Sequence, residues 1–238
     1  MKSFFIYFVV VVTLIVVGAV KYDCQPNNVS CGCGYSDVAF SSARIVGGDD
    51  AVESSWSMIV SLRFYGSKEH SCAGTLLSES FILTAANCVE RFADNASASI
   101  SIYAGVTRQS DDGGYERNVV KIYIHPNYTG WPYFINDIAL LEISSRLNFH
   151  NNPVIGRTCV HRIGESLLTH QQPLQNVTRL AIIGWGTIRP GSCALSDHLQ
   201  QIQVTVIENE NGICKNAINE SKLQFCAGLQ NGAKGNII

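Results

Sequence analysis

Short runs of apolar residues recur along most of the chain, and polar segments rich in glycine separate them. The runs follow one another at intervals of roughly 8–12 residues, a spacing typical of antiparallel sheets rather than of helices. We therefore predict an all-β sandwich or barrel with strands over residues 58–64, 75–77, 81–84, 99–103, 118–124, 138–143, 179–183 and 202–207. A helical pattern is present, weakly, over residues 208–218 alone.

The most continuous apolar run covers residues 4–20, behind a single charge at Lys2, and ends in the small residues Gly18 and Ala19. This arrangement is typical of a secretory signal peptide that is cut after Ala19. The run also reaches the lower length limit for a membrane-spanning helix, so a retained N-terminal anchor over residues 1–20 stays open as the alternative. Either interpretation places the rest of the chain outside the cytosol, as a secreted protein or as a membrane-anchored protein with an extracellular domain.

The composition of the 238 residues narrows the class of protein. A net charge of −2, with 17 basic and 19 acidic residues, provides no basic face for nucleic acid. A hydrophobic fraction of 46% is too high for a disordered chain and is sufficient for a large core. Nine cysteines indicate an oxidising compartment, and their odd number leaves at least one without a partner in the monomer.

Two further features agree with passage through the secretory pathway. Residues 21–44 are polar, rich in cysteine and without periodicity, which indicates a disulfide-linked propeptide ahead of a folded domain. Five N-x-[ST] sequons are present, although chance alone would supply some of them. We expect glycosylation at Asn28, Asn95, Asn127, Asn176 and Asn219.

Five short segments carry a resemblance to a known family. In chain order they are Arg-Ile-Val-Gly-Gly (44–48), Leu-Thr-Ala-Ala-Asn-Cys-Val (83–89), Asp-Ile-Ala-Leu-Leu (137–141), Gly-Trp-Gly (184–186) and Phe-Cys-Ala-Gly (225–228). Their order and separations resemble the trypsin-like serine proteases of the chymotrypsin fold. The resemblance covers residues 45–238 and implies two antiparallel β-barrels, with the second barrel incomplete in this chain. It also implies serine-type endopeptidase chemistry on protein or peptide partners, without a cofactor.

The resemblance implies most of the cysteine pairing. Cys72 and Cys88 match the family's bridge beside its catalytic histidine, and Cys214 and Cys226 match its second-lobe bridge. Cys159 resembles the cysteine that tethers a cleaved propeptide, with Cys33 or a neighbour as its partner. The other two propeptide cysteines would then pair with each other. Cys193 is left over, either as a free thiol or as half of an intermolecular disulfide.

The bond between Arg44 and Ile45 resembles the family's activation site. A basic residue there ends a polar linker just before the first glycine-rich turn, which suits proteolytic cleavage. In the family, the new N-terminal ammonium group folds inward and pairs with an aspartate beside the nucleophile.

Two of the three catalytic positions depart from the family pattern. Acyl transfer of this kind needs a hydroxyl nucleophile, an imidazole base and a carboxylate that orients the imidazole. Asp137 matches the family's aspartate, but Asn87 occupies the place of its histidine, and an amide cannot act as a general base. We expect Asp137 to accept a hydrogen bond from the Asn87 amide. No other histidine is an obvious substitute; His70 resembles a non-catalytic histidine of the family.

The nucleophilic serine is absent from the printed sequence. The chain stops at Ile238, short of the family's Gly-Asp-Ser-Gly-Gly, and Gly235 stands where trypsin-like members carry the aspartate that selects Lys and Arg. We expect no peptidase activity, since losing base and nucleophile together costs more than about 10⁶-fold in rate. We also hypothesise that the codons after Lys234 are intron read-through and that a longer form exists. A transcript ending at Ile238 would contradict this.

No metal site is expected. Val106 occupies the place of a glutamate in calcium-binding family members, and Asp111 with Asp112 is interpreted as a solvated turn.

Three functions compete: an inactive secreted homologue with a binding or regulatory role, an active endopeptidase whose sequence is damaged at Asn87 and the C-terminus, and a membrane-tethered β-scaffold ectodomain.

Overall fold

The structure is a computed structural model that describes residues 31–32, 38, 48–67, 69–94, 99–111, 113–150, 152–159, 179–187, 194–208, 211–212, 214–215, 218 and 224–228. Outside these ranges lie the predicted signal or anchor, most of the propeptide, and the predicted sites at Arg44, Ile45, Cys33, Cys193, Asn28, Asn95, Asn176 and Asn219. None of the helices within the described ranges has the length and apolar character needed to cross a membrane.

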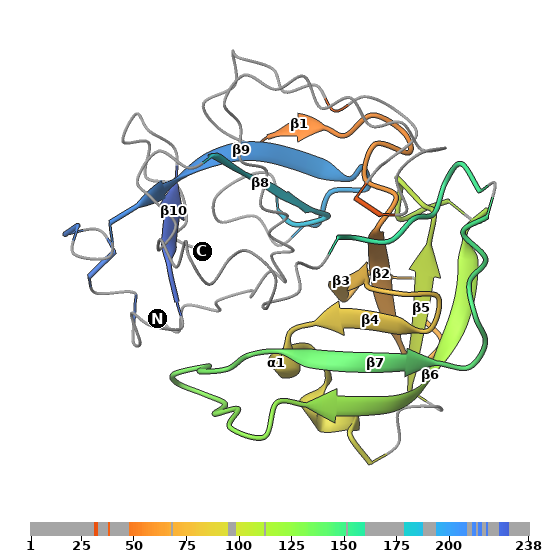
Figure 1. The fold of residues 1–238 in the computed structure, drawn as a ribbon, viewed down its shortest axis with the longest axis horizontal. Helices are drawn as coiled ribbons and strands as arrows, with labels where there is room; N and C mark the ends of the chain where they lie inside the picture. The colour runs from red at the N-terminus through yellow and green to blue at the C-terminus, as the bar shows by residue number, and fades with distance from the viewer. Residues whose placement is uncertain are drawn as a thin grey trace, which may run out of the picture.

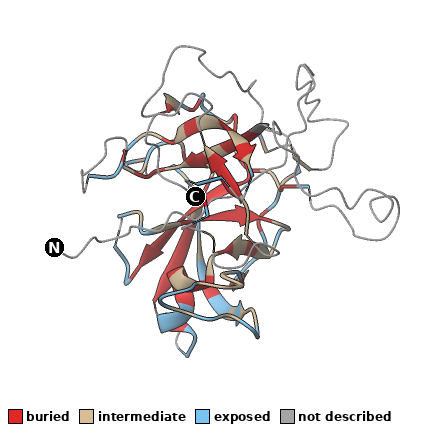
Figure 2. Ribbon diagram, turned by 90° about the vertical axis from the view of Figure 1, so that its left-hand side faces the viewer, coloured by how far each residue is buried: buried red, intermediate tan, exposed pale blue. Residues whose placement is uncertain are grey.

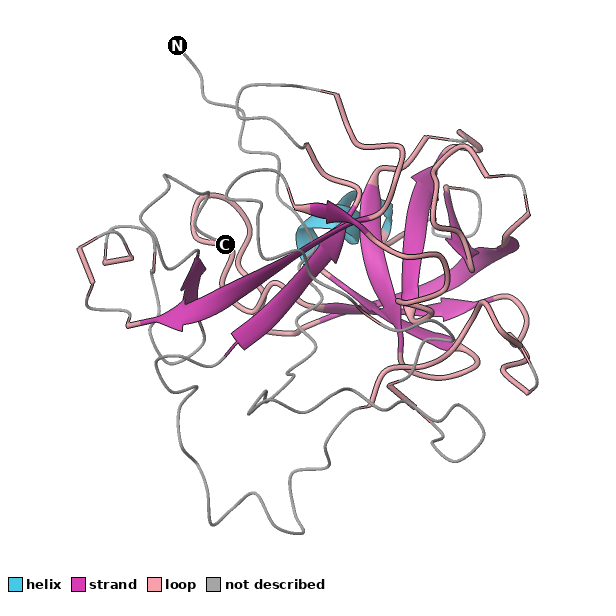
Figure 3. Ribbon diagram, turned by 90° about the horizontal axis from the view of Figure 1, so that it is seen from above, coloured by secondary structure: helices cyan, strands magenta, loops and turns pink. Residues whose placement is uncertain are grey.

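Nearly all regular structure in the described ranges is β-strand, which confirms the predicted all-β class (Figure 3). The strands are β1 (Asp49–Asp50), β2 (Ile59–Phe64), β3 (Cys72–Leu76), β4 (Phe81–Thr84), β5 (Ile100–Ala104), β6 (Tyr115–Ile124), β7 (Ala139–Ile143), β8 (Arg179–Gly184), β9 (Gln200–Ile207) and β10 (Cys226–Gly228). Between β4 and β5 lie the short helix α1 (Ala86–Val89) and the 3-10 helix η1 (Glu90–Phe92).

Six strands close into a barrel in the order β2-β3-β4-β7-β6-β5, with every neighbouring pair antiparallel (Figure 1). Buried residues alternate with more exposed ones along β4 and β7, so Ile82 and Leu141 pack inside the barrel. β2 is buried along its whole length because Val60 belongs to the barrel core while Ile59 packs on the other side. A Cβ on Gly74 would lie 2.7 Å from the Ile82 Cγ2 atom, so glycine is required there.

The remaining strands form a second sheet in which β9 pairs with β1, β8 and β10. In the described part of the chain this sheet has four strands and is not closed, which agrees with the predicted incomplete second barrel. A shared core joins it to the barrel, where Met58 and Ile59 pack in one cluster with Ile183, Trp185 and Leu199. Figure 2 shows buried residues in the strands of both sheets.

Hydrogen bonds attach the loop after β5 to the chain that leads into β9. The backbone N–H of Gln109 donates to the Asp197 carbonyl oxygen over 2.8 Å. The backbone N–H and the hydroxyl of Ser110 donate to the two carboxylate oxygens of Asp197 over 2.9 and 3.0 Å. Because these partners are far apart in sequence, the bonds hold the barrel and the second sheet together as one unit.

Candidate active site

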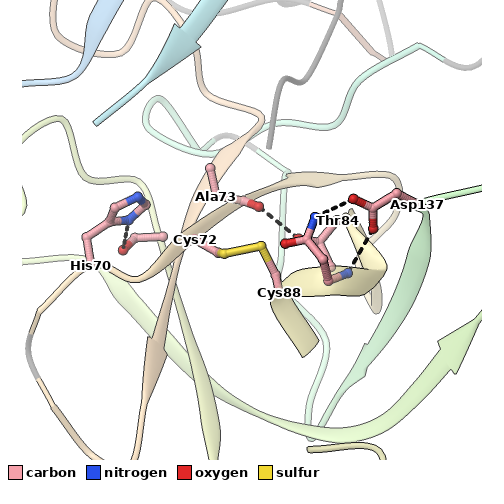
Figure 4. The surroundings of a disulfide bond; sticks show 8 residues. His70, Cys72, Ala73, Thr84, Cys88 and Asp137 are labelled. Carbon is pink, nitrogen blue, oxygen red and sulfur yellow. Dashed lines mark hydrogen bonds between the residues drawn. A yellow bond between two sulfur atoms is a disulfide. The ribbon is translucent and has the colours of Figure 1, made fainter. Parts of the chain in front are cut away.

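The helix α1 presents Asn87 at the end of β4. The neighbouring side chains Ala86, Cys88 and Val89 are buried, which leaves the half-buried Asn87 side chain on the open side of the turn. A disulfide from Cys88 to Cys72 in β3 attaches this turn to the barrel (Figure 4). The local sequence therefore fixes the position of residue 87 by packing on one side and by a covalent bond.

Asp137 lies opposite Asn87, just before β7. Its carboxylate accepts a hydrogen bond from the backbone N–H of Asn87 over 2.8 Å and another from the Asn87 side-chain Nδ2. The expected bond between the two side chains is therefore present. A carboxamide can donate to the carboxylate as an imidazole N–H would, but it offers no nitrogen that can take up a proton near neutral pH.

Hydrogen bonds within the β6–β7 connection determine the position of Asp137. The Asn136 side chain donates to the Asn127 carbonyl oxygen over 2.8 Å, and the backbone N–H of Thr129 donates to the Ile135 carbonyl over 3.0 Å. Phe134 and Asn136 have φ angles of 46° and 55°, a region that non-glycine residues seldom adopt. Such a backbone persists only where its surroundings hold it, so the carboxylate stands on a strongly constrained segment.

His70 lies on the other side of the Cys72–Cys88 bridge from Asp137 (Figure 4). Its Nδ1 atom is 2.8 Å from the hydroxyl oxygen of Ser61, and the centroids of the His70 and Trp185 rings are 5.0 Å apart. Burial lowers the pKa of His70 from 6.5 to about 4, and the nearby Arg63 charge contributes to the shift. The imidazole is therefore neutral at physiological pH and hydrogen-bonded to Ser61.

Two more disulfides are present, one between cysteines 12 residues apart and one between cysteines 128 residues apart. Cys214 bonds to Cys226, as the resemblance implied. Cys159 bonds to Cys31, so the neighbour of Cys33 rather than Cys33 itself is its partner. Beside the bridge, the backbone N–H of Gly32 donates to the carbonyl of Arg157 over 2.7 Å and joins the two segments.

Sequence reasoning missed a carboxylate and a phenol beside this site. Glu90 at the start of η1 and Tyr128 both lie close to Gly130, the residue before the exposed Trp131 and Tyr133. Burial raises the pKa of the Tyr128 phenol, and the charges of Asp137 and Glu90 raise it further. The run Trp-Pro-Tyr-Phe between Gly130 and the family's aspartate is the sequence signal that could have indicated the exposed aromatic rings.

No group of three or more His, Cys, Asp or Glu side chains within the described ranges is arranged to hold a metal ion. The predicted turn at Asp111 is a local one, since the backbone N–H of Arg108 donates to the Asp111 carboxylate over 3.0 Å.

The hydroxyl of Thr84 supports the strand that leads into α1. It is buried and donates to the Ala73 carbonyl oxygen over 2.9 Å. Thr84→Val should lower the free energy of unfolding by about 1 kcal/mol, because the carbonyl loses its donor at nearly constant side-chain volume. Urea denaturation measures this change, with Ser71→Ala at an exposed position as the control. Equal stability of the two variants would contradict the assigned role of the Thr84 hydroxyl.

Comparison with known proteins agrees with the fold. A family model for trypsin matches residues 45–236. "Serine proteinase stubble" of Drosophila melanogaster is 30% identical over 217 residues, which are 85% of this chain and 25% of that protein. "Trypsin alpha" of Drosophila melanogaster is 34% identical over 167 residues, 69% of this chain and 57% of that protein.

A mammalian protein shows the same similarity. "Chymotrypsin-like elastase family member 1" of Felis catus is 29% identical over 177 residues, 72% of this chain and 61% of that protein. The chain thus spans less than two thirds of the length of each of these three relatives. Since the family model matches most of the chain and the barrel has the expected architecture, the chain belongs to the trypsin family of serine proteases.

Proposed function

We propose that this protein is a proteolytically inactive member of the trypsin family that binds a protein or peptide partner without cleaving it. The observation that carries the proposal is the Asn87 side chain hydrogen-bonded to Asp137. Acyl transfer requires a group that removes the proton from the attacking hydroxyl and returns it to the leaving amine. An amide at this position cannot do so, and loss of such a base lowers the rate by on the order of 10⁶-fold.

We also propose that the protein acts outside the cytosol. Three disulfides in the described ranges, Cys31–Cys159, Cys72–Cys88 and Cys214–Cys226, support an oxidising compartment. The predicted signal sequence and glycosylation sites agree with secretion. Cleavage between Arg44 and Ile45 would leave the N-terminal segment attached through Cys31, so processing would not release it.

An active endopeptidase is the second candidate, and membership of a protease family favours it. Under this alternative the retained Asp137 would have to act with a base other than Asn87. His70 is the histidine nearest to Asn87 in sequence, but its Nδ1 atom is engaged with Ser61 and its ring packs on Trp185. These contacts favour the inactive form.

Turnover of quenched fluorescent peptides tests the proposal. Full-length protein secreted from eukaryotic cells is assayed before and after cleavage at Arg44, against peptides with Lys, Arg, Phe or Ala before the scissile bond. "Trypsin alpha" of Drosophila melanogaster is the positive control, and its variant with asparagine at the matching histidine is the negative control. We expect turnover by the positive control alone. Turnover by the Asn87 protein, abolished by a serine-directed inhibitor, would refute the proposal.

A further inference from the structure

Arg63 is a charged residue buried where the barrel meets the second sheet. It lies next to the end of β2 and is 1% exposed. It shares the outward face of this strand with Ser61 and with Ile59, which packs in the core common to the two sheets. A guanidinium stays positively charged at every physiological pH. Removing such a charge from water is unfavourable unless an anion or several acceptors compensate for it.

The contacts of the Arg63 guanidinium within the described ranges are with uncharged groups. One terminal nitrogen donates a hydrogen bond to the Gln109 carbonyl oxygen over 2.9 Å. The group lies over the Tyr103 ring, with 3.7 Å between the guanidinium carbon and the ring centroid. The Nε atom is buried and has no hydrogen-bond partner in this part of the chain. These two contacts leave most of the five N–H groups of the cation without a protein acceptor.

No carboxylate within the described ranges forms an ion pair with Arg63. The strands β2, β3 and β5, which are neighbours in the barrel, contain neither aspartate nor glutamate. Two aspartates of the adjoining loops accept other hydrogen bonds, Asp111 from the backbone N–H of Arg108 and Asp197 from Ser110. The positive charge of Arg63 is therefore not neutralised by these neighbours.

The imidazole of His70 responds to this charge. Burial is the main cause of its lowered pKa, about 4 in place of 6.5, and the positive charge of Arg63 is the second cause. A guanidinium that is paired with a carboxylate has little net effect on an imidazole nearby, because the two charges cancel. The lowered pKa therefore agrees with an Arg63 charge that lacks a partner among the described residues.

A second buried polar group lies beside Arg63. Ser101 in β5 is directly opposite Arg63 in the antiparallel register and is 8% exposed. Directly opposite residues of paired strands point to the same face of a sheet, so the Ser101 hydroxyl and the Arg63 side chain share one face. A guanidinium N–H group without an acceptor, a hydroxyl on the same face and no paired carboxylate together suit an anion.

We propose that Arg63 and Ser101 form a buried binding site for a small monovalent inorganic anion such as chloride. The Nε–H group of Arg63 and the hydroxyl of Ser101 donate to the anion, which neutralises the guanidinium at the junction of the two sheets. Because Arg63 is almost fully buried, a compact ion suits this position, whereas the carboxylate of another protein cannot approach it. The site does not include Asn87 or Asp137, so the inference is independent of the proposed function.

Thermal unfolding of the full-length secreted protein in sodium chloride and in sodium gluconate, at the same pH and ionic strength, tests the site. Gluconate is too large to reach a buried guanidinium. Chloride at about fivefold its dissociation constant should raise the melting temperature by about 2–4 °C relative to gluconate. Arg63→Met keeps an unbranched apolar stem and removes the charge, so it should abolish this difference. Ser101→Ala should raise the dissociation constant of chloride about three- to tenfold.

Arg146→Gln is the matched control, since Arg146 is an exposed arginine that pairs with Glu79. This variant should keep the full chloride effect. NMR titration of His70 in the wild type is a second measurement that does not require any variant to fold. Chloride should raise the pKa of His70 toward 6.5 relative to its value in gluconate, because the bound anion offsets the charge of Arg63.

Equal melting temperatures of the wild type in the two salts would overturn the inference, and so would an undiminished chloride effect in Arg63→Met. The same conclusion follows if the pKa of His70 does not differ between chloride and gluconate. If Arg63→Met loses stability equally in both salts, Arg63 acts only as a donor to the Gln109 carbonyl and the anion site is refuted.

Discussion

Acidification from pH 7.5 to 4.5 should destabilise the folded protein through His70 alone by about 2–3 kcal/mol. The imidazole is enclosed between Ser61 and Trp185 and has a pKa lowered to about 4. In the unfolded chain the same group has a pKa of 6.5. The unfolded state therefore takes up a proton in a pH range in which the folded state does not.

This difference in proton uptake determines the direction in which the free energy of unfolding changes with pH. Well above pH 6.5 His70 is unprotonated in both the folded and the unfolded state, so it contributes no pH dependence to the free energy of unfolding. Between pH 6.5 and 4 only the unfolded state binds the proton, so the free energy of unfolding falls as pH falls. Below pH 4 both states bind it, and this loss reaches its limit. The burial of the ring is the main cause, with Arg63 second.

Urea denaturation at pH 7.5, 6.0 and 4.5 measures the effect, and His70→Gln is the control because glutamine does not titrate. The free energy of unfolding of the variant should fall less over this range than that of the wild type, by about 2–3 kcal/mol. NMR titration of the His70 ring gives an independent value. A midpoint near 6.5 in the folded protein, or parallel pH profiles of the two proteins, would contradict the prediction.

The strands that the sequence predicted best are short runs of mostly apolar residues, Phe-Ile-Leu-Thr (81–84) and Ile-Ala-Leu-Leu-Glu-Ile (138–143). The segment 81–84 coincides with β4, and 138–143 differs from β7 by one residue at its start. Periodicity did not find β1 and β10, because two or three residues are too few to show a period; tertiary pairing with β9 makes them strands. Within the weak helical pattern over 208–218 the structure describes residues 208, 211–212, 214–215 and 218 and assigns no helix to them. The N–H groups of Lys215 and Ile218 nevertheless donate to the carbonyls of residues four positions earlier, Asn211 and Cys214.

The candidate site was predictable only in part. Asn87 and Asp137 are 50 residues apart, and the family resemblance, not any local pattern, brought them together before the structure did. The partner of Cys159 was beyond prediction because Cys31 and Cys33 are nearly equivalent in sequence, and the disulfide to Cys31 is seen only in three dimensions. The proximity of Glu90 to Gly130 depends likewise on two loops from different strand pairs.

Asn87→Asp should destabilise the protein by about 2–3 kcal/mol at pH 7, because it replaces a donor to Asp137 with a second carboxylate. The Asp137 carboxylate can only accept hydrogen bonds, and the wild-type amide meets it with an N–H group. Two half-buried carboxylates within hydrogen-bonding contact repel each other unless one of them takes up a proton. The penalty should therefore shrink as pH falls toward 4.5, where protonation of the introduced carboxyl supplies a donor again.

Asn87→His is the matched control, since an imidazole N–H can donate to Asp137 as the amide does. Its free energy of unfolding should stay within about 1 kcal/mol of the wild type at pH 7, the size of a single rearranged hydrogen bond. Denaturation of both variants at pH 7 and 4.5 makes the comparison. If Asn87→Asp is as stable as Asn87→His at pH 7, the Asn87–Asp137 bond does not hold α1 against β7. The opposite result would show that this position still requires a hydrogen-bond donor in a protein whose residue 87 cannot serve as a base.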